Sequence, residues 1–98
     1  MNRKWIGMYK IKYTKVAKKH ISNLKAEKLD KKTKALIEIV KANPYQNPPA
    51  YEKLVGNFKG LYSRRINHQH RLVYEVFESE SEEDRIVKIV SMWTHYEF

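Results

Sequence analysis

The chain has 98 residues, of which 20 are Lys or Arg and 11 are Asp or Glu, so its formal net charge is +9. This length predicts one small domain with a modest core over residues 1–98. Residues 1–7 are expected to be a flexible leader. Because the chain has no cysteine, a disulfide framework and a cysteine-based zinc or redox site are excluded. The chain lacks the long apolar run of a signal peptide or membrane span, which favours a cytoplasmic protein with no membrane partner.

The charge is distributed unevenly along the chain. Residues 1–41 hold 13 Lys or Arg and three acids, whereas residues 78–84 hold five acids in seven positions. The basic part favours a polyanionic partner such as a nucleic acid, and a lysine-rich solvated surface is the alternative. The acidic segment is expected to be an exposed loop between strands, with a role in docking on a partner as the alternative.

The first half predicts one strand followed by two helices. Residues 8–13 alternate with a period of two, which is typical of a strand. Residues 15–25 and 27–42 carry apolar stripes with helical spacing, and Thr14 is a suitable N-cap for the first. Asn43-Pro44 ends the second helix, because a residue before proline is pushed out of the α region. The two helices are expected to form an antiparallel hairpin.

The second half predicts a sheet. A proline-rich connector, residues 44–50, leads to strand-like segments 61–66 and 71–77, which a tight polar turn joins. Residues 85–93 are β-branched and mostly apolar, as expected of an interior strand. The predicted fold is therefore α+β in the order β-α-α-β-β-β, with two N-terminal helices packed on one twisted, mainly antiparallel sheet. A short extra strand near Leu54 is an option.

Two arginines are the first candidates for a binding site. Arg65 and Arg71 flank the same predicted hairpin, so their guanidinium groups can approach each other. Such groups repel, and a phosphate between them relieves the repulsion because arginine forks match its oxygens. The alternative is an ion pair with Glu52 or Glu75 at the sheet edge. Metal ligation is not expected, because no carboxylate lies at ligand spacing from His68 and His70.

Several motifs together resemble a known family. Tyr51-Glu-Lys-Leu54 is followed by Gly60-Leu-Tyr-Ser-Arg-Arg-Ile66 and His70-Arg-Leu-Val-Tyr74, and His95-Tyr96 closes the pattern. Over residues 8–96 the chain resembles the YoeB/Txe branch of the RelE-type toxins of type II toxin–antitoxin systems. The resemblance implies a RelE/YoeB-like fold and a ribosome-dependent endoribonuclease that cuts mRNA in the ribosomal A site by metal-free acid/base catalysis, without a cofactor. It also implies inhibition by a YefM/Phd-like antitoxin.

The same resemblance assigns catalytic roles. Glu52 would be the general base for the 2′-hydroxyl group, Arg71 would stabilise the transition state, and His95 would be the general acid. Tyr96 would help to place the substrate or the histidine. Arg65 would contact phosphate, and the further candidates for this role are Arg64, Lys53 and Lys59. His70 is expected to be structural rather than catalytic.

The remaining expectations concern partners. Five helix lysines are expected to dock on ribosomal RNA, with a plain solvated helix face as the alternative: Lys18, Lys19, Lys31, Lys32 and Lys34. A homodimer would suit a small domain with a thin core. Two rival functions remain open, a non-catalytic ParE-like toxin on the same scaffold and a basic RNA-binding domain. The joint presence of Glu52, Arg71 and His95-Tyr96 favours the nuclease.

Overall fold

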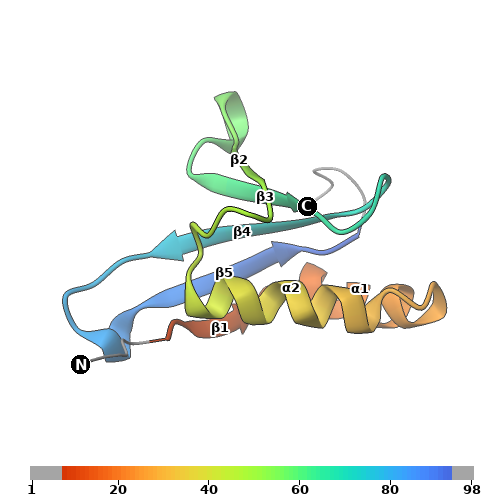
Figure 1. Ribbon diagram of the computed structural model, residues 1–98, viewed down its shortest axis with the longest axis horizontal. Helices are drawn as coiled ribbons and strands as arrows, with labels where there is room; N and C mark the ends of the chain where they lie inside the picture. Colours follow the sequence, from red (N-terminus) through yellow and green to blue (C-terminus); the bar gives the residue numbers. More distant parts are fainter. Residues whose placement is uncertain (1–7, 94–98) are drawn as a thin grey trace.

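The computed structural model describes residues 8–93, which form a five-stranded sheet with two α-helices packed on it (Figure 1). The elements in chain order are β1 (Lys10–Tyr13), α1 (Lys15–Ala26), α2 (Asp30–Ala42), β2 (Tyr51–Lys53), β3 (Leu61–Arg65), β4 (Arg71–Phe77) and β5 (Ile86–Ser91). Short 3₁₀ turns occupy Gly56–Phe58 and Glu82–Asp84. The predicted α+β fold is confirmed, and the optional extra strand is β2.

The sheet has the order β1-β5-β4-β3-β2. Only the β1–β5 pair is parallel, so the sheet is mainly antiparallel as predicted, and β5 is an interior strand between β1 and β4. The predicted tight turn joins β3 and β4. The Asn67 side chain holds this turn, because its Oδ1 accepts hydrogen bonds from the backbone N–H groups of Gln69 and His70, at 2.9 and 2.7 Å.

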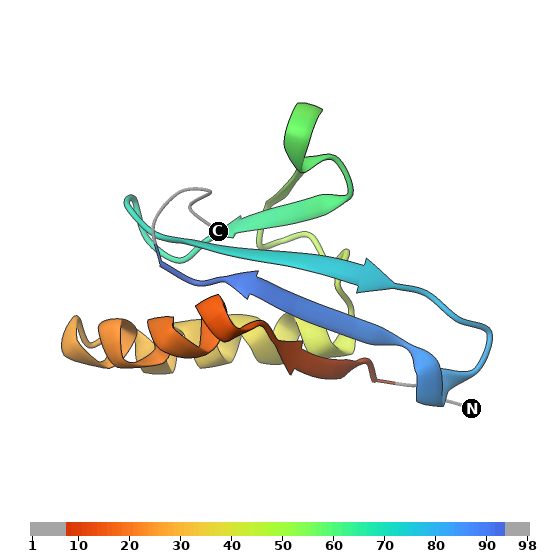
Figure 2. The ribbon, with the colours of Figure 1, turned by 180° about the vertical axis from the view of Figure 1, so that it is seen from behind.

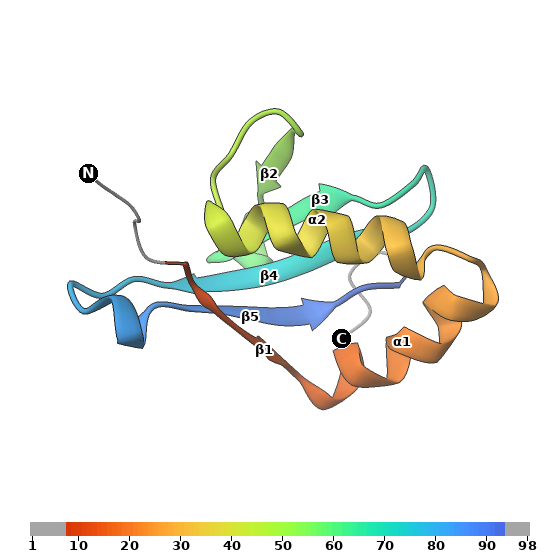
Figure 3. The ribbon, with the colours of Figure 1, turned by 60° about the horizontal axis from the view of Figure 1, so that its bottom comes forward.

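The two helices form the expected hairpin, which Figure 3 shows most clearly. Thr14 caps α1, since its hydroxyl oxygen accepts a hydrogen bond from the backbone N–H of Ala17 at 3.1 Å. The prediction that the second helix begins at residue 27 is wrong, because α2 begins at Asp30. Lys28 adopts a left-handed conformation with φ of 59°, and this conformation reverses the chain between the helices. No helix within residues 8–93 is long and apolar enough to cross a membrane.

The hydrophobic core lies between the helix pair and one face of the sheet (Figures 1 and 2). Its helix side includes Ala17, Leu24, Leu36, Ile37 and Val40, and its sheet side includes Leu72, Tyr74, Val87 and Ile89. Burial of each large aliphatic side chain contributes roughly 1.5–3 kcal/mol to stability. Side chains alternate along a strand, so residues next to these sheet positions point to the face away from the helices.

The acidic segment 78–84 lies between β4 and β5, as expected. Its first residue is more than a solvated charge, because the Glu78 carboxylate accepts hydrogen bonds from the hydroxyl groups of Tyr9, at 2.7 Å, and Tyr45. Burial, together with the hydrogen bond to Glu78, raises the pKa of Tyr9 to about 12. The acidic segment is therefore tied both to the chain before β1 and to the proline-rich connector before β2.

Candidate active site

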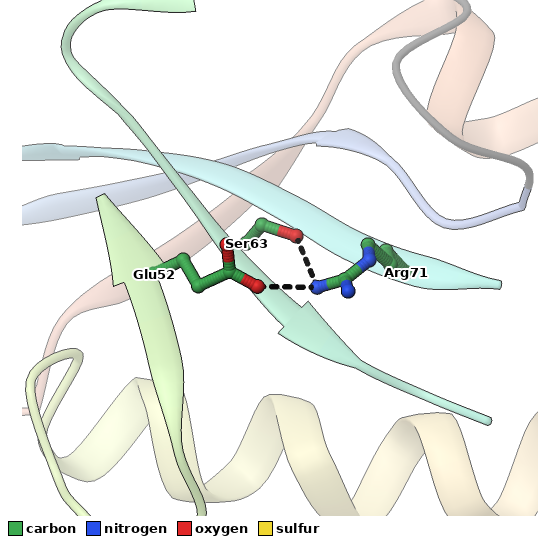
Figure 4. Close-up of polar contacts among 3 residues, drawn as sticks. All are labelled: Glu52, Ser63 and Arg71. Atoms are coloured by element: carbon green, nitrogen blue, oxygen red, sulfur yellow. Dashed lines mark hydrogen bonds and ion pairs between the residues drawn. The ribbon is translucent and has the colours of Figure 1, made fainter. Parts of the chain in front are cut away.

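Three neighbouring strands bring Glu52, Ser63 and Arg71 together (Figure 4). Glu52 on β2 lies opposite Ser63 on β3. Arg71 lies on β4, and its Nη1 donates to Glu52 Oε1 at 3.1 Å and to Ser63 Oγ at 3.4 Å. These side chains lie on the sheet face away from the helices, because Leu72, which follows Arg71, belongs to the core.

The two partners of the ion pair differ in exposure. The Arg71 side chain is 14% exposed, whereas the Glu52 side chain is 61% exposed. The arginine is thus held by its surroundings, while the carboxylate stays open to solvent and to a substrate. A pair with one partner this exposed adds at most about 1 kcal/mol to stability. Its arrangement therefore matters more for chemistry than for holding the fold together.

The three residues line a cavity of about 350 Å³, to which Arg65 also contributes. Arg65 and Arg71 lie directly opposite each other on β3 and β4, which confirms that the hairpin brings the two arginines together. Two guanidinium groups and one carboxylate leave the cavity with an excess of positive charge, which suits a phosphate. The ion pair expected as the alternative is also present, and it involves Glu52, since Glu75 pairs with Lys88 at 3.5 Å.

Sequence reasoning missed part of this cavity. Ser63 and the backbone-rich wall formed by Pro49 and Ala50 also line it. A signal for Ser63 was available, because it lies two residues before Arg65 on one strand and therefore on the same face. No comparable signal exists for the wall, since the path of the connector depends on tertiary contacts.

The expectation that Arg64 is a phosphate ligand on the surface is wrong. Arg64 is only 1% exposed, and it lies on the opposite face of β3 from Ser63 and Arg65. Its three guanidinium nitrogens donate to the Tyr74 hydroxyl and to two connector carbonyl groups. Buried to this extent, the guanidinium group is closed to a substrate from solvent.

The other predicted phosphate ligands, Lys53 and Lys59, do not line the cavity. Lys53 lies opposite Tyr62, on the other face of β2 from Glu52, and Lys59 directly follows the Gly56–Phe58 turn. Both are exposed, so contact with a longer RNA stays a prediction for them. His95 and Tyr96 lie outside the described residues, and their roles stay predictions as well.

His70 is buried, and it supports the end of the hairpin. Its ring stacks on Trp93 with centroids 3.8 Å apart, and its Nδ1 lies 2.9 Å from the Trp93 carbonyl oxygen. This position agrees with the expected structural role. Among residues 8–93, no three His, Cys, Asp or Glu side chains gather as metal ligands would.

The helix surface carries all five lysines that were expected to dock on RNA, and each is exposed. A larger groove of about 500 Å³ lies beside the helices, and its lining mixes apolar residues such as Ile21 and Ile37 with charged residues such as Lys31. Among the described residues, no arginine lines that groove. The smaller cavity is the candidate active site, because it brings a carboxylate and two arginines together.

Comparison with known proteins identifies the class to which this fold and site belong. The family model described as the YoeB-like toxin of bacterial type II toxin–antitoxin systems matches residues 16–96. Toxin YoeB from Synechocystis sp. is 37% identical over 71 residues, which are 72% of this chain and 76% of that protein. The chain therefore belongs to the family of YoeB-like toxins of type II toxin–antitoxin systems, as the motifs in residues 51–74 indicated.

Solved structures agree with this assignment. A YoeB/ParE toxin from Agrobacterium tumefaciens superposes with a TM-score of 0.77 at 26% identity, covering 89% of this chain and 99% of that one. YoeB in a YoeB–YefM complex from Staphylococcus aureus gives 0.72 at 34% identity, covering 90% and 98%. The Staphylococcus aureus YoeB dimer gives 0.71 at 33% identity, covering 91% and 99%. The fold is thus the RelE/YoeB-like fold.

Proposed function

We propose that this toxin is a ribosome-dependent endoribonuclease that cleaves mRNA in the ribosomal A site. The observation that carries the proposal is the contact between Glu52 and Arg71 at 3.1 Å, in a cavity that Arg65 also lines. A base next to two arginines, one of them held in place by its contacts, is what metal-free RNA cleavage needs on the side of the attacking hydroxyl group.

The reaction assigns one task to each group. The 2′-oxygen attacks the adjacent phosphorus while Glu52 accepts the hydroxyl proton. The bond from phosphorus to the 5′-oxygen breaks, and His95 donates a proton to that oxygen. Arg71 and Arg65 stabilise the negative charge that the pentacoordinate phosphorus gathers. The products are a 2′,3′-cyclic phosphate and a 5′-hydroxyl group, so protons and charge balance.

The present geometry is that of the free protein. Arg71 is bonded to Glu52, and a phosphate entering between the arginines would compete with the carboxylate for that guanidinium group. Release of Glu52 from the pair makes its oxygen available to the 2′-hydroxyl group. Because a carboxylate is a weak base toward a sugar hydroxyl, much of the rate must come from positioning, which a ribosome-bound mRNA can supply.

The proposed partners follow from charge and from the relatives. Five exposed helix lysines would meet ribosomal RNA, and a toxin that acts on ribosomes would work in the cytoplasm. A YefM/Phd-like antitoxin would cover the basic surface with an acidic segment, as the Staphylococcus aureus toxin is found with YefM. A homodimer is proposed on the same basis, since the Staphylococcus aureus toxin is also known as a dimer.

Comparison of two matched substitutions tests the nuclease. Glu52→Gln removes the base but keeps a hydrogen-bond acceptor for Arg71, and Glu75→Gln breaks the other ion pair of the same sheet. In single-turnover cleavage of ribosome-bound mRNA, Glu52→Gln should lower the rate constant about 10²–10⁴-fold, while Glu75→Gln should leave it unchanged. Equal rates for both variants would overturn the proposal, and a toxin that stops growth without cutting RNA would point to a non-nuclease target.

A further inference from the structure

Arg64 is a buried cation that the proposed chemistry does not use. Its Nε donates to the Tyr74 hydroxyl group at 3.0 Å, its Nη1 to the Pro49 carbonyl oxygen at 2.6 Å and its Nη2 to the Pro44 carbonyl oxygen at 3.0 Å. The Tyr74 hydroxyl group itself donates to the Pro44 carbonyl oxygen at 2.7 Å. One guanidinium group therefore gathers both ends of the proline-rich connector.

The segment held in this way has few other restraints. β2 is a three-residue edge strand, and β3 is its one neighbour in the sheet. The prolines before it have no N–H group, so their backbone can form hydrogen bonds only through carbonyl oxygens. Arg64 supplies the donors to those carbonyls, and its guanidinium carbon lies 4.9 Å from the centroid of the Tyr51 ring.

We propose that Arg64 is a positioning residue that sets the place of Glu52 relative to Arg71 in the cleavage reaction. The inference rests on the proposed function, because it assumes that Glu52 is the base. Arg64 contacts Pro49, three residues before Glu52, and Tyr51, the residue directly before it. Tyr51 pairs with Arg64 and shares its face of the sheet, while the Glu52 carboxylate lies on the other face, 3.1 Å from Arg71.

A cluster of tyrosines around Tyr62 limits the part of the connector that depends on Arg64. Tyr62 stacks on Tyr74 with centroids 5.6 Å apart, and it contacts Tyr51 and Tyr45 at 5.8 and 5.7 Å. The Tyr45 hydroxyl group also donates to Glu78. These contacts hold the first part of the connector without Arg64. Tyr51 is also held by Tyr62 and by its pairing with β3, so loss of the guanidinium fork should loosen mainly Pro49 and Ala50, just before it.

The expected effect is on rate rather than on ribosome binding. A reacting group displaced by about 1 Å can lose roughly 10²-fold in rate. Arg64→Lys keeps the charge but replaces the planar fork by one ammonium group, which cannot meet the three acceptors in the same geometry. We expect its single-turnover rate constant to fall about 10- to 100-fold, with the half-saturating ribosome concentration changed less than about twofold.

A double-mutant cycle with Glu52→Gln gives a readout that a purely structural role would not move. If Arg64 acts through Glu52, Arg64→Lys should lower the rate about 10- to 100-fold when Glu52 is present and less than about threefold when Gln replaces it. Tyr74→Phe, which removes one acceptor of Arg64 and keeps the ring, gives a second cycle and carries the test if Arg64→Lys does not fold. Ile89→Val is the control for stability, because Ile89 is fully buried in β5 and its side chain forms no hydrogen bond with Arg64 or the connector.

The outcomes separate this proposal from the proposed function. Ile89→Val is expected to lower the fraction of active protein without changing the rate constant. The same result for Arg64→Lys would overturn the positioning role. An equal fold loss in both backgrounds would also overturn it, while the nuclease mechanism stands. If Glu52→Gln cleaved RNA at the full wild-type rate, Glu52 would not be the general base. The positioning role of Arg64 would then be excluded as well.

Discussion

Arg71→Gln should abolish most of the activity and leave the stability nearly intact. The substitution removes the guanidinium group that contacts Glu52 Oε1 at 3.1 Å and Ser63 Oγ at 3.4 Å. The ion pair lost is worth at most about 1 kcal/mol, because the Glu52 side chain is 61% exposed and water replaces its partner. Removal of the positive charge opposite Arg65 offsets part of that loss, since like charges facing each other across two strands destabilise a sheet.

The catalytic effect should be much larger. A preorganised donor aimed at developing charge contributes about 2.7–4 kcal/mol, which corresponds to roughly 10²–10³ in rate. A loss of about 1 kcal/mol from a domain of ordinary stability leaves nearly all molecules folded at 25 °C. It lowers the melting temperature by about 4–8 °C at most. Unfolding therefore cannot imitate the expected loss of rate.

The assay compares three proteins in single-turnover cleavage of ribosome-bound mRNA and in thermal unfolding followed by circular dichroism. Wild type and Arg71→Gln are compared with Lys88→Gln, which removes a cation from the other ion pair of the sheet. We expect Lys88→Gln to match the wild-type rate. An Arg71→Gln rate within about threefold of wild type would refute the reasoning, as would a fall in melting temperature well beyond about 8 °C.

Three further predictions concern RNA docking and pH. Replacement of Lys31, Lys32 and Lys34 by Gln should reduce the slope of log affinity for ribosomes against log salt concentration by about 2 to 3, because each phosphate contact releases about one counterion. An unchanged slope would exclude docking through α2. Burial lowers the pKa of His20 from its ordinary 6.5, and the Nδ1 of its neutral ring accepts the Met92 N–H at 3.1 Å. The neutral ring therefore stabilises the folded state fully above about pH 6.5, and this contribution is lost as the pH falls through the folded-state pKa. The wild-type melting temperature should therefore fall more steeply below about pH 6.5 than that of His20→Asn, and parallel curves would contradict the assignment. Glu78→Gln should lower the pKa of Tyr9 from about 12 toward its ordinary 10, which an ultraviolet titration of the tyrosines in alkali would detect, and an unchanged titration would show that burial alone raises it.

The sequence predicted those parts of the fold whose causes are local. The apolar stripe of α2, the Thr14 cap and the Asn67 turn each depend on residues close together in the chain. The facing pair Arg65 and Arg71 followed from the hairpin alone. The start of α2 was missed, because a lysine in the left-handed conformation carries no glycine-like signal.

For Arg64, the residue type suggested the wrong location, whereas the alternation of side chains along the strand indicates the right one. An arginine in a strand suggests a surface charge, yet Arg64 alternates with Ser63 and Arg65 and shares its face with Tyr62 and Ile66. That periodicity places it toward the core. Its acceptors, the Pro44 and Pro49 carbonyl groups, lie 20 and 15 residues earlier, so no local pattern could reveal them. The contact between Glu52 and Arg71, 19 residues apart, depends on the same connector path.

Primer-extension mapping of a reporter mRNA in a purified translation system, with and without ribosomes, tests the central claim most directly. Wild type would be run beside Glu52→Gln and His95→Gln. The account predicts a cut in the A-site codon that requires ribosomes and weakens strongly in both variants. Cleavage of naked RNA alone would contradict docking on the ribosome, and a cut that survives both substitutions would contradict the site itself.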